Sequence, residues 1–151
     1  MKCNLIVAGK TKKNYKGSSN FFLDNRYIPC DEVTAYFKSC DIVILPYDDT
    51  SVNTGVGTLS FQNCKTILSS SNVASLKDLK CKDFFTFSMV GKEILMGGEK
   101  KKTNEKNFMK AVDNIITKYD KFSLSKLGKN MRNEVKDNTT NFINGLKKLY
   151  S

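Results

Sequence analysis

The sequence predicts an α/β fold, a Rossmann-like parallel sheet with helices on both faces and further helices at its C-terminal end. Two patterns predict it. Short apolar runs that do not alternate with polar residues recur along the first part of the chain, as in strands buried on both faces. Segments with apolar residues at helical spacing lie between and after these runs. The 151 residues, 40% of them hydrophobic, supply the length and the core material of one domain.

The first elements are expected in the order strand, strand, helix. The first strand is the apolar run Leu5–Ala8, which ends at Gly9 and is predicted to be buried. A polar, basic loop leads to a second strand candidate, "FFLDNRYI", which stops at Pro29. Asp31 can cap the helix that follows, and the apolar face of this helix carries Val33, Tyr36 and Phe37.

The remaining strands and helices continue this alternation. "DIVILPY" is the clearest strand, residues 54–63 follow as a helix, and "KTILSS" and "FFTFSM" are the fourth and fifth strand candidates. The last third of the chain predicts three amphipathic helices, over residues 103–119, 123–135 and 140–150. No linker divides the chain, so we expect a single domain over residues 1–151.

The composition excludes several kinds of chemistry. The chain has no histidine, which rules out Ser-His and Cys-His catalysis. Its five cysteines are widely spread and form no Cys-x-x-Cys pair, so a structural zinc site is not expected, and we interpret them as small buried hydrophobes in a reducing cytosol. No stretch approaches the ~20 apolar residues of a membrane span. The expected compartment is the cytoplasm.

A net charge of +10 raises the question of an anionic partner. The charge is concentrated in residues 98–151, which hold 13 basic and 6 acidic residues. Nucleic acid and an anionic membrane surface are the obvious candidates. The lysine cluster at 100–102 has acidic neighbours and no arginine or aromatic residue beside it, so nucleic acid is not expected.

The stretch "DIVILPYDDTSVNTGVG", residues 41–57, changes abruptly from apolar to polar. In open parallel sheets, ligands bind beyond the carboxyl ends of the strands, where the following helix begins. The first N–H groups of a helix have no partner within it, and Gly55 and Gly57 would let an anion approach them. The alternative is structural, with Asn53 or Thr54 simply capping the helix.

The order of these motifs resembles the C-terminal, donor-binding half of a retaining two-domain glycosyltransferase of the Rossmann-like (GT-B type) class. The closest resemblance is to the family 4, group 1 type that builds cell-surface or capsular polysaccharides. The resemblance covers roughly residues 4–90 and rests on "LIVAG", "YIP", "DIVILPY" and "NTGVGTLSFQNCKTILSS". Where the family has a glycine before its next strand, this chain has Cys64, and Thr66 stands in the family's proline position. Two family glutamates fall at about Ser51 and at Leu59, or at Ser60 with a shift of one, and none of these residues is acidic.

The resemblance implies a site for a nucleotide-sugar, which is a substrate and not a cofactor; no metal and no protein nucleophile are implied. The base would lie near Ile28, the diphosphate at the Gly55 amide, and the sugar against Asn53 and Thr54. Gly9 and Lys10 would border the same cleft. The full set of expected substrate-binding residues is Gly9, Lys10, Tyr27, Ile28, Pro29, Tyr47, Asn53, Thr54, Gly55 and Val56.

The resemblance also implies an incomplete enzyme. An intact member of this class carries an N-terminal acceptor domain and an earlier strand-helix unit, so we expect this chain by itself not to catalyse transfer. The acceptor domain is the expected partner, peripheral association with the inner membrane face fits the full enzyme, and exposed apolar surface would favour self-association. Two other classes of protein stay open: a non-enzymatic doubly wound signalling or interaction domain, and a basic nucleic-acid-binding module.

Overall fold

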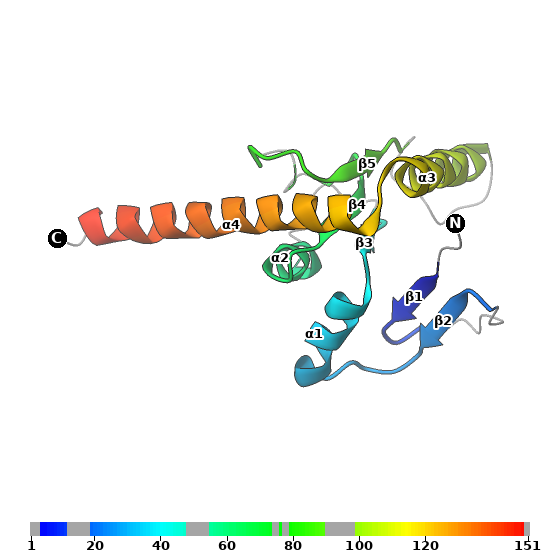
Figure 1. The fold of residues 1–151 in the computed structure, drawn as a ribbon, viewed down its shortest axis with the longest axis horizontal. Coiled ribbons are helices and arrows are strands. Elements are labelled where there is room, and N and C mark those ends of the chain that lie inside the picture. Colours follow the sequence, from blue (N-terminus) through cyan, green and yellow to red (C-terminus); the bar gives the residue numbers. More distant parts are fainter. Residues whose placement is uncertain are drawn as a thin grey trace. The chain divides into compact units, whose positions relative to one another are not determined.

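The computed structural model describes residues 4–11, 19–47, 55–73, 76, 79–89 and 99–149 (Figure 1). It confirms the α/β class, because the strands pair in parallel and alternate with helices along the first part of the chain. The strands form two sheets, one of two strands and one of three. The chain divides into two compact units, unit 1 (Met1–Cys40) and unit 2 (Asp41–Ser151), and each is described by itself.

Unit 1 consists of β1 (Leu5–Ala8), β2 (Phe21–Asp24) and α1 (Cys30–Ser39). The two strands run parallel, with Leu5 opposite Phe21 and Ala8 opposite Asp24. β2 is shorter than predicted. The backbone of β1 turns away at Gly9, whose φ of 133° suits glycine, and its N–H closes the ladder on the carbonyl of Asp24 at 3.0 Å.

The prediction that the first strand is buried is wrong. Leu5 and Ile6 are 44% and 40% exposed, and Phe22 of β2 is 60% exposed. A strand is buried on both faces only when helices cover both, and the described part of unit 1 supplies a single helix for a two-stranded sheet. Unit 1 therefore presents apolar sheet surface.

Unit 2 contains β3 (Ile42–Leu45), α2 (Gly55–Gln62), β4 (Thr66–Ser70), β5 (Phe85–Phe87), α3 (Glu99–Lys118) and α4 (Lys121–Leu149). Its parallel sheet has the order β3-β4-β5. Ile67 of the central strand packs on one face with Phe61 and Met131, from α2 and α4. Leu68 packs on the opposite face with residues of α3 and α4. This arrangement confirms helices on both faces of the sheet.

The C-terminal region contains one long helix where the sequence predicted two. α4 begins beyond Asp120, whose carboxylate accepts the Ser123 N–H at 2.7 Å, and it continues through the polar segment that was expected to interrupt it. Inside that segment the hydroxyls of Thr139 and Thr140 donate to carbonyls four residues earlier, at 2.9 and 3.0 Å. These bonds use the side chains without opening the helix. Figure 1 shows α4 extending well past α2 and the sheet of unit 2.

Candidate functional site

The carboxyl ends of the unit 2 strands are joined by two serines of β4 and its following turn. The Ser70 hydroxyl donates to the carbonyl of Tyr47, just beyond β3. The Ser71 N–H donates to the Phe87 carbonyl at 2.9 Å, at the end of β5. These serines are not among the residues predicted for the site, although a serine run directly after apolar strand residues is a signal for this edge. They hold the sheet edge where ligands bind in this class of fold.

The N-terminal end of α2 leaves its backbone accessible. Gly55 and Val56 are exposed, and a Cβ added at Gly55 would meet no atom within 4 Å. The first turn carries no acidic side chain that would repel an anion. The helix dipole and the backbone N–H groups of a first helical turn favour negative charge at this position. Asn53 and Thr54, the predicted sugar contacts, lie outside the described residues.

The C-terminal end of α2 makes a left-handed turn at Cys64. Its φ is 56°, and the N–H of Lys65 donates to the Ser60 carbonyl at 2.9 Å while the N–H of Cys64 donates to the Phe61 carbonyl at 2.9 Å. This is the hydrogen-bond pattern with which many helices end, usually with glycine in the left-handed position. The turn leads directly into β4, so it sets the direction of the central strand.

In unit 1, the predicted residues Gly9 and Lys10 follow β1. The loop after β1 is tied to the end of β2, because the Thr11 N–H donates to Oδ1 of Asn25 at 2.7 Å. Lys10 is exposed. The carboxyl ends of both strands of unit 1 therefore form one connected edge, as the parallel arrangement requires.

The segment Tyr27 to Pro29 connects this edge to α1. Tyr27 is 77% exposed, whereas Ile28 and Pro29 are half-buried. Pro29 stands at the helix start, and its carbonyl accepts the N–H groups of Glu32 and Val33 at 3.0 and 3.2 Å. Proline suits this place because its own missing N–H would have no partner inside the helix.

Arg26, beside that segment, was missed by the sequence analysis. Its Nε lies 3.1 Å from both carboxylate oxygens of Asp24, its Nη1 donates to Oε1 of Glu32 at 3.1 Å, and its Nη2 contacts Oε2. The hydrogen bond to Glu32 raises the pKa of Arg26, and the same bond lowers the pKa of Glu32. Tyr36 donates to Asp24, and this bond raises the pKa of the phenol. The network fixes the start of α1 against the end of β2.

The structure thus describes the expected site residues in two separate groups. Gly9, Lys10, Tyr27, Ile28 and Pro29 belong to unit 1, whereas Tyr47, Gly55 and Val56 belong to unit 2. Within unit 2, α2 packs on both β3 and β4, so its first residues and Tyr47 are part of one body. Among the described residues no group of three or more His, Cys, Asp or Glu side chains could hold a metal ion.

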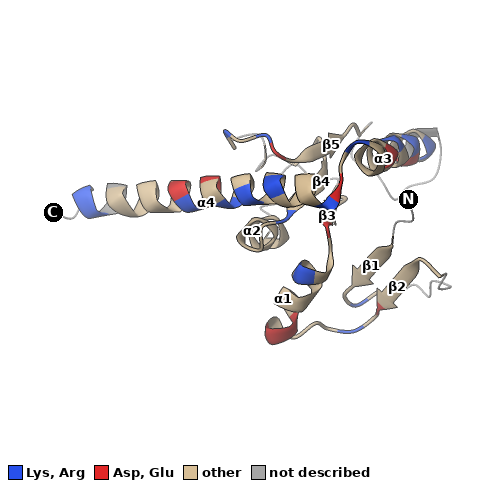
Figure 2. Cartoon of the chain, viewed as in Figure 1, with Lys and Arg blue, Asp and Glu red and all other residues tan. Residues whose placement is uncertain are grey.

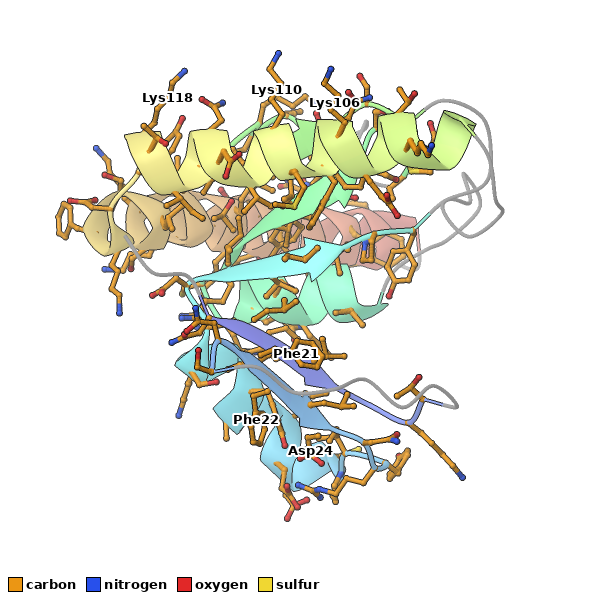
Figure 3. The ribbon with its side chains drawn as sticks, turned by 90° about the vertical axis from the view of Figure 1, so that its right-hand side faces the viewer. Phe21, Phe22, Asp24, Lys106, Lys110 and Lys118 are labelled. Atoms are coloured by element: carbon orange, nitrogen blue, oxygen red, sulfur yellow. The ribbon has the colours of Figure 1, made fainter. Side chains whose placement is uncertain are left out.

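The basic side chains of the chain are distributed differently from the expected site residues. Lysines are spread along α3 and α4 (Figure 2). Those labelled in Figure 3, Lys106, Lys110 and Lys118, project from α3 away from the sheet of unit 2. This lysine face offers any anion a non-specific attraction.

Comparisons with known proteins assign no family to this chain, so an assignment of function rests on the geometry of the site. A scan against protein-family models, a search of curated proteins and a search of solved structures each found no significant match. In the part of the chain that the structure describes, none of the helices combines the length and apolar character needed to span a membrane.

Proposed function

We propose that this chain is the nucleotide-sugar donor-binding domain of a glycosyltransferase that acts in cell-surface or capsular polysaccharide synthesis. The observation that carries the proposal is the unit β3-α2-β4, which begins its helix at the unobstructed Gly55 and ends it at the left-handed Cys64. Cys64 occupies the position where the resembling family has glycine, the residue that this backbone conformation favours. Thr66, in the family's proline position, is the first residue of β4, where proline is tolerated.

The proposed binding mode uses the backbone more than the side chains. The diphosphate is held by the N–H groups at the start of α2. The sugar hydroxyls meet Asn53 and Thr54. The contacts of Lys10 with a phosphate and of Tyr27, Ile28 and Pro29 with the base stay predictions from the sequence. The chemistry of a retaining sugar transfer of this type places no demand on a protein nucleophile, which agrees with the lack of histidine. Affinity on the order of millimolar is expected, which corresponds to about 4 kcal/mol.

A titration with uridine and guanosine diphosphates, followed by backbone amide NMR shifts, tests the proposal. Shifts centred on Gly55 to Gly57 are expected. Shifts confined to lysines of α3 and α4 would mean attraction by charge alone and would contradict the proposal. A parallel titration with inorganic sulfate separates anion binding from nucleotide binding, because the nucleotides should shift Gly55 to Gly57 at lower concentrations than sulfate does.

A pair of variants at Gly55 separates binding from folding. Gly55→Asp places a negative charge at the helix start, where it stabilises the helix but repels a diphosphate. Gly55→Asn adds a side chain of the same shape without the charge, into space that is open in the structure. We expect the Asp variant to bind at least several-fold more weakly than the Asn variant while unfolding at the same or a higher temperature. Equal binding by both would contradict an anion site at α2.

A further inference from the structure

A polar groove of unit 2 lies between α4 and the segment that precedes β5. It has a volume of about 490 Å³. Lys80 and Cys81 form one wall, and the other wall is a single face of α4 with Asn130, Asn133, Glu134, Asp137, Asn138 and Asn141. Residues three and four apart share a helix face, so these side chains converge along the groove.

Two interactions pin the walls of the groove together. The carboxylate of Glu134 accepts the backbone N–H groups of both Lys80 and Cys81, the latter at 2.6 Å. One turn earlier on α4, Nδ2 of Asn130 donates to Oδ2 of Asp83 at 2.6 Å. A carboxylate that accepts two backbone donors holds a chain segment in one geometry, so the groove is preformed. These two α4 residues are therefore occupied in positioning the wall.

The other α4 side chains of the groove are available for a ligand. Within the described part of the chain, the amides of Asn133, Asn138 and Asn141 and the carboxylate of Asp137 make no hydrogen bond or ion pair with protein atoms. Each amide offers two donors and one acceptor oxygen, and the carboxylate is an acceptor only. A mixed row of donors and acceptors is the pattern that matches hydroxyl groups, since a hydroxyl both donates and accepts.

The charge and polarity of the residues that line the groove argue against phosphate, nucleic acid and extended peptides as ligands. In a chain of net charge +10, the described residues that line this groove supply two carboxylates and one lysine, so it disfavours phosphate and nucleic acid. Among these described lining residues, Cys81 alone has an apolar side chain, so an extended peptide would find no pocket there for apolar side chains of its own. We propose that the groove binds a neutral saccharide chain, through its asparagine amides and Asp137. This site is separate from the donor site, and the proposal does not depend on the proposed function.

The test is a titration with maltotetraose, cellotetraose and N,N′-diacetylchitobiose, followed through side-chain NH₂ signals of asparagine in NMR spectra. We expect at least one of these saccharides to shift the signals of Asn133, Asn138 and Asn141, with a dissociation constant on the order of millimolar. No response to any of the three overturns the proposal, as does a response confined to residues outside the groove. Tetraalanine is the competing probe, and a groove response to it in place of the saccharides also overturns the proposal.

Matched double variants on α4 connect the response to the groove. Asn138→Ala with Asn141→Ala is expected to weaken saccharide binding at least tenfold. Thr140→Ala with Asn144→Ala changes two exposed residues of the same helix that do not line the groove, and it should bind as the unchanged chain does. Circular dichroism and thermal unfolding verify that both variants are folded. Gly55→Asp should leave saccharide binding unchanged, which distinguishes a failure of this proposal from a failure of the donor site.

Discussion

Gly128 of α4 and Cys64 after α2 approach so closely that a Cβ added to the glycine would lie 2.0 Å from the Cys64 carbonyl oxygen. The obstructing atoms belong to the backbone, so they cannot rotate away. Alanine at an ordinary helix position is favoured over glycine by about 1 kcal/mol. At position 128, glycine should instead be favoured over alanine.

Gly128→Ala is therefore expected to lower the free energy of unfolding by about 2 kcal/mol or more, as overpacking in a core does. Urea denaturation followed by circular dichroism measures it. Thr140→Ala, on an exposed part of α4, is the control and should change stability by no more than about 0.5 kcal/mol. A Gly128→Ala variant as stable as the unchanged chain would show that α4 and the α2 turn do not make this contact.

A glycine substitution at Cys64 should change the free energy of unfolding in the opposite direction. Its left-handed backbone costs a residue with a Cβ about 1 kcal/mol, and glycine removes this cost. Cys64→Gly should therefore raise the free energy of unfolding. This gain is reduced because the substitution also removes the weak contact between Nη1 of Arg132 and the Cys64 sulfur at 3.4 Å. Cys40→Gly is the matched control, because Cys40 has an extended φ of −99° and glycine there should destabilise. The same sign of change at both positions would refute the assigned turn.

Asp120 makes the stability of α4 depend on pH. Hydrogen bonds from Ser123 lower the pKa of the Asp120 carboxyl in the folded chain. A lowered folded pKa contributes stability above the unfolded value of about 3.9, and this contribution is lost as pH falls toward the folded value. Thermal unfolding of Asp120→Asn, which keeps the cap but cannot titrate, should differ from the unchanged chain near neutral pH and converge with it in acid. A constant difference across the pH range would contradict this assignment.

The cysteines should differ in reactivity. Burial raises the pKa of the Cys81 thiol, with the nearby carboxylates of Asp83 and Glu134 acting in the same direction, whereas Cys30 is exposed at the first position of α1. Because the thiolate is the reactive form, limiting iodoacetamide at mildly alkaline pH should modify Cys30 before Cys81. Peptide mass spectrometry gives the two rates, and unfolding in urea should bring them together. Faster labelling of Cys81 in the folded chain would contradict the structure.

The apolar sheet surface of unit 1 predicts self-association. Exposed Leu5, Ile6 and Phe22 can associate with a second copy of the chain, and within the described part of unit 1 no further strand pairs with the edges of the two-stranded sheet. Light scattering should show a mass that rises with concentration, and Phe22→Ser should reduce this rise. Phe122→Ser removes an exposed phenylalanine from α4 and serves as the control. A constant monomer mass at all concentrations would contradict this prediction.

The sequence was most informative where local pattern and tertiary structure agree. The run of β4, which is buried throughout, and the helical spacing in α1 predicted their elements because each pattern reflects burial that the unit supplies. The run in β1 has the same pattern but is exposed, because apolar composition reports what a strand can bury and not whether a neighbour is present to cover it. The gap expected over residues 136–139 is absent for a similar reason, since the weak helix formers Asp137, Asn138 and Thr139 end a helix only when nothing extends it from both sides.

The candidate site was only partly predictable. Gly55 and Tyr47 follow from the strand-then-helix pattern, which locates the carboxyl edge of a parallel sheet. Arg26 and Ser70 did not follow, because their roles depend on partners, Glu32 and Tyr47, that are set by tertiary contacts. The groove on α4 required the structure for the same reason: Glu134 and Cys81 are 53 residues apart along the chain.

Met131 of α4 is 0% exposed and packs in the same core as Leu45, Phe61 and Ile67. During translation, those three side chains emerge from the ribosome long before Met131 does, and they have no complete core to join in the meantime. Unit 2 is thus expected to fold only after most of α4 has been synthesised, with its nascent β-strands open to aggregation until then. A helix near the end of the chain sets the earliest moment at which the sheet can become stable.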